Sequence, residues 1–139
     1  MTRNPISDSP NLTAALTYAA RGWAVFPINW LREEQEFRGR PGQVKRYINL
    51  MCSCWRGDSG QECDRAGKHP IYDRELGLEQ GFRDATTDEK TIRAWWGKYP
   101  LANIGIRTGR ESGLIVVDID PRKGGTDTWF EYCTAYGNP

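Results

Sequence analysis

The sequence predicts an α+β fold in which helices pack against a mixed β-sheet. Segments with a helical apolar period and short apolar runs follow one another along the chain, and no segment repeats. One irregular stretch, at about residues 31–70, interrupts this order. The length fits a single domain spanning residues 1–139, which is large enough to bury a core without disulfides.

A first helix is expected close to the N-terminus. Ser9 or Asn11 can cap it, and apolar residues then recur with a helical period. Gly22 is expected to end this helix in the left-handed conformation. The apolar run 23–28 predicts a strand, and Pro27 indicates that this strand lies at a sheet edge or is near its end.

Residues 31–70 are expected to form an irregular insertion, because charges, glycines and three cysteines dominate a stretch without a clear period. The stretch contains a basic segment. This segment is either a solvated loop or a contact with a nucleic-acid backbone, since Lys and Arg side chains neutralise phosphates. Its cations are Arg38, Arg40, Lys45 and Arg46.

A second helix is expected after Thr86, because Thr86 and Glu89 fit a capping box. Trp95 and Trp96 fall on the apolar face of this helix, which predicts that both rings lie in the core. The alternative role of the two rings is stacking on bases.

Two strands and a last helix follow in the predicted order. Residues 103–108 are a short strand candidate, and the continuous apolar run 114–117 is typical of a strand covered on both faces. The last helix begins near Thr126, and its Cys133 is expected to be an ordinary core residue.

Asp118 and Asp120 directly follow the most apolar run of the chain. Side chains alternate along a strand, so both carboxylates are expected on one face and Ile119 on the other. Two neighbouring carboxylates repel each other unless a cation lies between them, and oxygen ligands suit Mg²⁺ or Mn²⁺. The pair is a candidate divalent-metal site. The alternatives are a solvated turn before Pro121 and the similar pair of nucleotide-sugar glycosyltransferases.

A second candidate metal site lies in the insertion, where three thiols and the only histidine of the chain can supply a tetrahedral Cys₃His zinc site. Such a site has no open position, so the zinc would be structural. An insertion with few apolar residues also needs something other than a core to order it. The alternatives are free thiols in a mobile loop and a disulfide, which a reducing compartment disfavours. The candidate ligands are Cys52, Cys54, Cys63 and His69.

Charge and hydropathy set outer limits on the function. The formal net charge of +1 neither indicates nor excludes a nucleic-acid partner. No run approaches the roughly 18 apolar residues of a membrane span, and the polar N-terminus has no apolar run like that of a signal peptide. We therefore expect a cytoplasmic protein without a membrane partner.

Taken in order, several segments resemble the bifunctional DNA primase/polymerase N-terminal domain, which occurs in phage and plasmid replication proteins, often ahead of a helicase. The resemblance covers nearly the whole chain from about Leu12 onward. The segments that carry it are AALTYAARGWAVFP (14–27), GKHP (67–70), GFRDATTD (81–88), WW (95–96), PLANIGIRTG (100–109) and SGLIVVDIDP (112–121).

The resemblance implies a fold of the archaeo-eukaryotic primase type, and it makes Asp118 and Asp120 the first metal-binding motif of a nucleotidyltransferase. Two Mg²⁺ or Mn²⁺ ions would serve the reaction. A zinc-binding insertion, a DNA template, nucleoside triphosphates and a helicase domain in the same protein or replisome are also implied. Lys68 and Arg107 are candidates for neutralising the triphosphate, unless they are ordinary solvated cations.

The sequence also departs from the family pattern. The second family motif carries a nucleotide-binding histidine and the third carries another metal-binding acid, both downstream of the first motif. Here the only histidine is His69, which precedes Asp118. We therefore expect a truncated member with an incomplete site, which is inactive by itself. The alternative is a non-catalytic, zinc-containing nucleic-acid-binding module.

Overall fold

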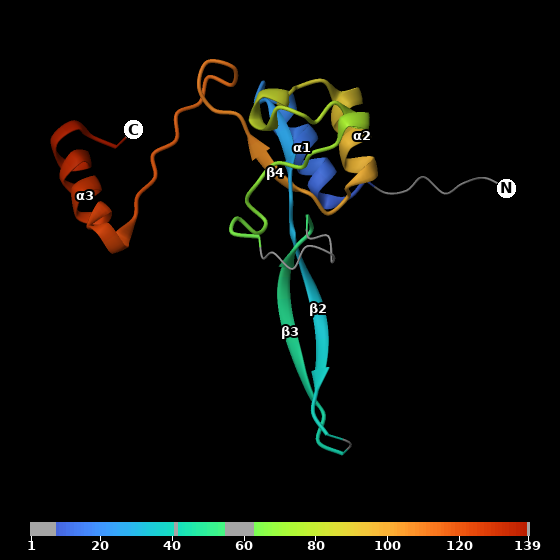
Figure 1. Cartoon of the computed structure of the whole chain (residues 1–139). Coiled ribbons are helices and arrows are strands. Elements are labelled where there is room, and N and C mark those ends of the chain that lie inside the picture. The colour runs from blue at the N-terminus through green and yellow to red at the C-terminus, as the bar shows by residue number, and fades with distance from the viewer. Residues whose placement is uncertain (1–7, 41, 55–62, 139) are drawn as a thin grey trace.

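The computed structural model describes residues 8–40, 42–54 and 63–138 (Figure 1). Its elements form an α+β architecture with two small antiparallel sheets, which confirms the predicted class but not a single mixed sheet. In chain order the elements are α1 (Pro10–Ala20), β1 (Val25–Ile28), β2 (Leu31–Arg38), β3 (Lys45–Cys52), η1 (Arg74–Leu76), η2 (Gly81–Asp84), α2 (Glu89–Lys98), β4 (Asn103–Ile106), η3 (Pro121–Lys123) and α3 (Gly125–Tyr136), where η denotes a 3-10 turn.

Helix α1 begins after Ser9, whose Oγ accepts a hydrogen bond from the backbone N–H of Leu12 at 3.1 Å. Ser9 is therefore the N-cap, and it is one of the two residues predicted for this role. The other candidate, Asn11, instead donates from Nδ2 to the carbonyl oxygen of Ala102 at 2.9 Å. Gly22 follows the helix with a φ of +82°, which confirms its predicted left-handed conformation.

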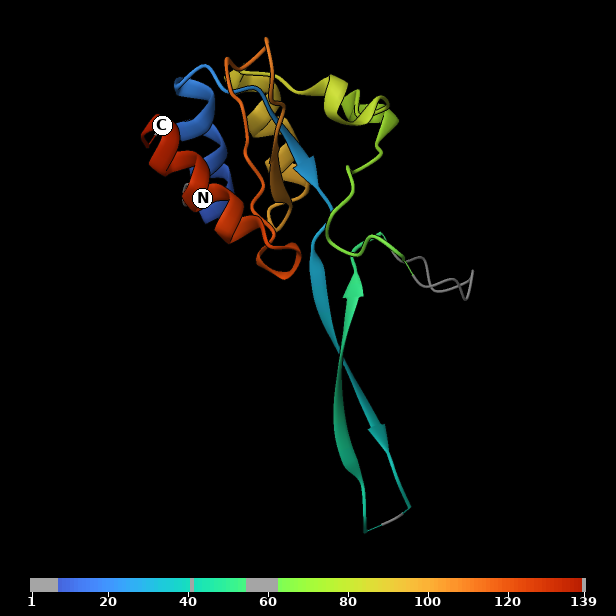
Figure 2. The same ribbon diagram turned by 90° about the vertical axis from the view of Figure 1, so that its left-hand side faces the viewer.

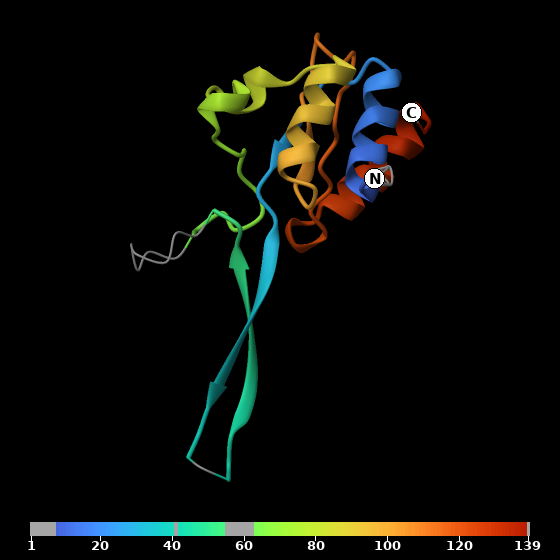
Figure 3. The same cartoon turned by 90° about the vertical axis from the view of Figure 1, so that its right-hand side faces the viewer.

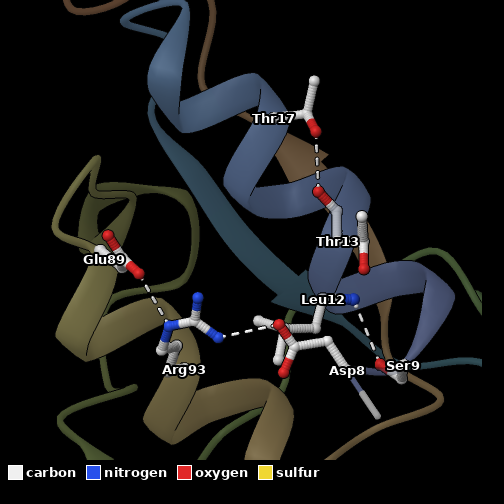
Figure 4. A network of polar contacts seen from close by, with 7 residues as sticks. All are labelled: Asp8, Ser9, Leu12, Thr13, Thr17, Glu89 and Arg93. Carbon is white, nitrogen blue, oxygen red and sulfur yellow. Dashed lines mark hydrogen bonds and ion pairs between the residues drawn. The ribbon is translucent and has the colours of Figure 1, made fainter.

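The start of α1 is also joined to α2 by a polar network (Figure 4). Arg93 of α2 donates to Asp8 at 2.9 Å and to Glu89, one turn earlier in its own helix, at 2.8 Å. All three side chains are about half exposed or more, so this network contributes at most about 1 kcal/mol of stability. The packing of the two helices must therefore come mainly from apolar burial.

The core lies where α1 and α2 pack beside β1 and β4 (Figures 2 and 3). Trp96 is 1% exposed and its Nε1 donates to the Ala102 carbonyl at 3.0 Å, while Trp95 Nε1 donates to the Leu76 carbonyl at 3.0 Å. The predicted burial of both rings is thus confirmed. The buried cluster consists of Leu12, Ala15, Val25, Ile71, Leu78, Ile92, Trp95, Trp96 and Ala102.

The cap of α2 differs from the prediction. Asp88 is the N-cap, and its carboxylate accepts a hydrogen bond from the backbone N–H of Thr91 at 2.8 Å. The hydroxyl of Thr86 instead accepts from the N–H of Asp88 at 3.0 Å. The capping box from Thr86 to Glu89 was wrong because a stronger capping residue stands two positions later.

Strands β1 and β4 pair antiparallel, with Val25 opposite Ile106 and Pro27 opposite Ile104. β4 is the only strand partner of β1 in the described residues, so Pro27 lies on an edge strand, as predicted. Gly105 lies directly under the Phe26 ring, where any Cβ atom would collide with the ring. The close approach of these two strands therefore requires glycine at this position.

The insertion is not irregular over its first half. Strands β2 and β3 form an antiparallel hairpin in register from Leu31 opposite Cys52 to Arg38 opposite Lys45, and the hairpin projects from the body of the molecule (Figure 1). The prediction was wrong because a ribbon with solvent on both faces does not need alternating apolar and polar residues. That alternation arises only where one face is buried.

The predicted strand at 114–117 is also absent from the described structure. Leu114 forms a single bridge with Gly109, and the chain continues without a strand partner, so Ile115 is 93% exposed. α3 lies apart from α1 and α2 and has no buried residue, and Cys133 is only half-buried (Figure 1). The core role predicted for Cys133 was wrong, because residues 115–117 form no strand in the described structure and α3 has no buried residue.

None of the helices in the described part of the chain combines the length and the apolar character that crossing a membrane requires.

Candidate metal centre and acidic site

The four predicted zinc ligands converge at the base of the hairpin. One ligand atom from each of Cys52, Cys54, Cys63 and His69 lies within 4.8 Å of the other three. In a tetrahedral site with Zn–S bonds of about 2.3 Å, ligand atoms lie about 3.8 Å apart. The observed spacing needs only a small contraction to reach that geometry. Among the described residues, this is the one group of three or more Cys, His, Asp or Glu side chains that could hold a metal ion.

Backbone pairing explains why residues so far apart in sequence meet here. The hairpin returns Cys52 to a position opposite Leu31, and the N–H of Ser53 donates to the Trp30 carbonyl at 2.8 Å. On the other side, the N–H of Asn29 donates to the His69 carbonyl at 2.9 Å. The segments around Cys52 and His69 therefore both attach to residues 29–31.

Asn29 forms a buried polar hub behind His69. Its Nδ2 donates to the carbonyls of His69 at 3.3 Å and Pro70 at 3.1 Å, and its Oδ1 accepts from Ser53 Oγ at 2.8 Å. The side chain is only 6% exposed. Asn29 was not among the predicted site residues, although a polar residue directly after the apolar run 23–28 was an available signal.

The ring orientation of His69 suits a metal ligand. Its Nδ1 lies 3.2 Å from both the Pro70 carbonyl oxygen and Asn29 Nδ2, whereas Nε2 lies 3.3 Å from Cys52 Sγ and faces the cluster. A metal bound at Nε2 would place the ring proton on Nδ1, where the Pro70 carbonyl can accept it. Metal-bound histidines commonly donate their other ring N–H to a carbonyl in this way.

The electrostatics of the cluster also favour a cation at its centre. Burial by itself raises the pKa of Cys52, but hydrogen bonds from the Gly67 and Cys54 backbone amides and from neighbouring side chains lower it to about 6. Desolvation and, to a lesser extent, the adjacent thiols of Cys52 and Cys63 together raise the pKa of Cys54 to about 12. Full deprotonation of three thiols this close requires a positive charge between them. The donor set therefore fits a thiolate-binding metal.

The structure places Asp118 and Asp120 in the extended segment before η3. Asp118 is exposed, and its carboxylate has no hydrogen-bond or ion-pair partner among the described residues. Asp120 caps η3 by accepting from the N–H of Arg122 at 3.0 Å and pairs with the Arg122 side chain at 3.1 Å. A pocket of about 500 Å³ adjoins Asp118 but not Asp120, and it is lined by Val117, Asp118, Ile119, Gly125, Thr128, Trp129 and Tyr132.

The two predicted phosphate-binding cations differ in their surroundings. Lys68 is exposed, and its amine has no partner within the described ranges. Arg107 forms an ion pair with Glu111, and its guanidinium lies 5.7 Å from the centroid of the Phe82 ring. Neither cation forms a hydrogen bond or ion pair with Asp118 or Asp120 in the part of the chain that the structure describes.

The chain is a small α+β domain whose Cys₃His cluster could hold a metal ion. The model of the bifunctional DNA primase/polymerase N-terminal family matches residues 15–138. Because the match covers nearly the whole chain, the chain belongs to this family. Membership indicates a function related to DNA priming and polymerisation, with DNA and nucleotides as its substrates. No curated protein and no solved structure matches the chain.

Proposed function

We propose that this chain provides part of the active site of a DNA primase/polymerase, which joins nucleotides on a DNA template by divalent-metal-dependent nucleotidyl transfer. The family match over residues 15–138 is the observation that carries the proposal. The proposal includes a core of the archaeo-eukaryotic primase type, a cytoplasmic location, a role in phage or plasmid replication and a helicase in the same protein or replisome.

Asp118 and Asp120 are the proposed ligands for Mg²⁺ or Mn²⁺. Bound ions of this kind lower the pKa of the attacking 3′-hydroxyl and stabilise the departing pyrophosphate. Asp118 is free to bind a cation, whereas Asp120 must first release Arg122. The Arg122 side chain is 89% exposed, and an exposed ion pair contributes at most about 1 kcal/mol. A divalent cation therefore competes easily with Arg122 for this carboxylate.

Lys68 and Arg107 are the proposed contacts of the nucleoside triphosphate. Lys68 offers an uncompensated ammonium group, and Arg107 would exchange Glu111 for a phosphate oxygen. Gly67, directly before Lys68, donates its N–H to Cys52 Sγ at 3.4 Å. This hydrogen bond to a candidate zinc ligand positions the backbone beside Lys68. A zinc ion without an open coordination site would therefore position Lys68 indirectly, through Cys52 and Gly67.

A primer-synthesis assay tests the proposal in a protein that contains this domain, with a single-stranded template, nucleoside triphosphates and Mn²⁺ or Mg²⁺. Asp118→Asn combined with Asp120→Asn is expected to reduce synthesis to background. Glu79→Gln combined with Glu131→Gln removes the same charge from exposed positions and should leave synthesis unchanged. Wild-type synthesis by the aspartate variant would refute the assignment.

A non-catalytic, zinc-containing nucleic-acid-binding module is the second candidate function. It is favoured by one contrast: the four Cys₃His ligand atoms already lie together, whereas Asp118 and Asp120 are not joined by a third potential ligand among the described residues. A protein that contains zinc and binds DNA, but synthesises nothing with either metal, would support this candidate over the first.

A further inference from the structure

The far end of the β2–β3 hairpin carries a concentrated positive charge. We define the hairpin tip as residues 37–40 and 42–46. This stretch contains four cations and no Asp or Glu, although the whole chain has a net charge of only +1. The Gln43 N–H donates to the Arg40 carbonyl at 2.9 Å and closes the turn between the strands. The cations of the hairpin tip are Arg38, Arg40, Lys45 and Arg46.

Three of these four cations are uncompensated. Arg38 donates two hydrogen bonds to Glu36, at 2.6 and 2.7 Å, and lies 5.7 Å from the centroid of the Tyr47 ring. Arg40, Lys45 and Arg46 are exposed, and none has an acidic partner in the described part of the chain. The free charge of the hairpin tip therefore belongs to the turn and the start of β3.

An exposed aromatic ring lies beside these free cations. Phe37 is directly opposite Arg46 in the strand register and is 64% exposed. The hairpin that contains Phe37 projects away from α1 and α2 in all three views of the chain (Figures 1, 2 and 3). The Phe37 ring therefore has no role in the core. A large apolar side chain next to free cations is suited to binding a ligand that carries both aromatic rings and negative charge.

We propose that the hairpin tip binds single-stranded DNA, with Arg40, Lys45 and Arg46 contacting phosphates and Phe37 stacking on an unpaired base. Proteins that bind single strands combine a positive surface with aromatic side chains in this way. A duplex satisfies the cations equally but keeps its bases stacked, so Phe37 specifically favours a single strand. The inference rests on the proposed function only in taking DNA as the template, and it concerns a surface other than the proposed catalytic residues.

The salt dependence of binding tests the phosphate contacts. Affinity for a fluorescent oligothymidine is measured by anisotropy between 50 and 200 mM salt, without nucleotides or added Mg²⁺, so that no synthesis occurs. A plot of log affinity against log salt has a negative slope, and each lost phosphate contact to a single strand makes this slope less steep by about 0.7. Lys45→Gln with Arg46→Gln should therefore reduce the slope by about 1.4. Lys90→Gln with Arg110→Gln removes two exposed cations elsewhere and should leave the slope unchanged.

Phe37→Ala tests the stacking contact. It should weaken binding at least about fivefold at every salt concentration without changing the slope, because stacking on a base involves no counterion release. The substitution removes an exposed side chain, so the melting temperature should stay at the wild-type value, which confirms that the protein is folded. Unchanged affinity in a folded Phe37→Ala protein would overturn the role of the ring.

The outcomes separate this inference from the proposed catalytic function. A slope for the Lys45 and Arg46 variant equal to that of the control would overturn the hairpin contact, even in a protein that synthesises primers. Tighter binding of duplex than of single-stranded DNA of equal length would overturn the choice of a single strand. A changed slope in a protein without synthetic activity would support the hairpin contact while contradicting nucleotidyl transfer.

Discussion

The Nε2 atom of His69 lies 3.3 Å from the Sγ atom of Cys52, the last residue of β3. This contact joins the base of the projecting hairpin to the segment that runs along β1. A metal bound there would join directly two segments that otherwise meet mainly through residues 29–31. The contact therefore makes the Cys₃His cluster the link between the hairpin and the core.

The first prediction concerns metal content. Protein purified under reducing conditions should contain about one zinc ion per chain, because the donor set and spacing match a four-ligand structural site. Cys52→Ser should remove most of this zinc, as measured by plasma mass spectrometry. Cys133→Ser is the matched control, since Cys133 is a half-buried thiol outside the cluster. Zinc-free wild-type protein would rule out the site.

The second prediction concerns Asn29 as a positioning residue for His69. Asn29→Ala removes the hydrogen bonds that hold the backbone of His69 and Pro70, so zinc affinity should fall by about 10- to 100-fold. Competition with a chromophoric chelator measures this affinity. Asn49→Ala, which removes an exposed amide from β3, should have little effect. Equal affinity in wild type and Asn29→Ala would show that His69 needs no such support.

The third prediction concerns Asp73 and pH. Asp73 is buried, and hydrogen bonds from Lys98 Nζ and Tyr99 Oη, both at 2.6 Å, lower the pKa of its carboxyl group. A pKa below that of the unfolded chain stabilises the protein above about pH 4, and the stabilisation is lost as pH falls through the folded-state pKa. Asp73→Asn should therefore be less stable than wild type at pH 7, and the difference should shrink on acidification.

Urea unfolding at pH 7 and at about pH 3 measures this difference. Glu75→Gln is the control, because Glu75 pairs with the same Lys98 at 3.1 Å but is 86% exposed. Its effect should be small at both pH values. A difference between Asp73→Asn and wild type that stays constant with pH would show that the charge of Asp73 is not responsible for its contribution.

The fourth prediction compares two aromatic residues. Trp96→Ala removes a fully buried ring and should lower the free energy of unfolding by about 3–5 kcal/mol. Phe130→Ala in α3 removes a ring that is 73% exposed and should change it by no more than about 0.5 kcal/mol. Chemical denaturation measures both. A large loss for Phe130→Ala would show that α3 packs on the core in solution.

The positions of α1 and α2, and the burial of Trp95 and Trp96, followed from the sequence because helix caps and a helical apolar period act between near neighbours. The capping box at Thr86 failed for the same local reason, since the neighbouring Asp88 competes for the role. The hairpin was missed because its faces are both exposed and leave no apolar alternation to detect. Leu114 to Val117 looked like a covered strand, but a strand also needs partners, which local sequence does not specify.

The four candidate Cys₃His ligands could be predicted from the sequence, because only these residue types offer thiolate and imidazole donors in the insertion. Their meeting within 4.8 Å was decided by tertiary structure, through the hairpin register and the hydrogen bonds around Asn29. Asp118 and Asp120 were likewise recognisable as oxygen ligands from sequence. Only the folded chain decides that Asp120 pairs with Arg122 while Asp118 has no ion-pair partner among the described residues, because ion pairs depend on distances that residue order does not contain.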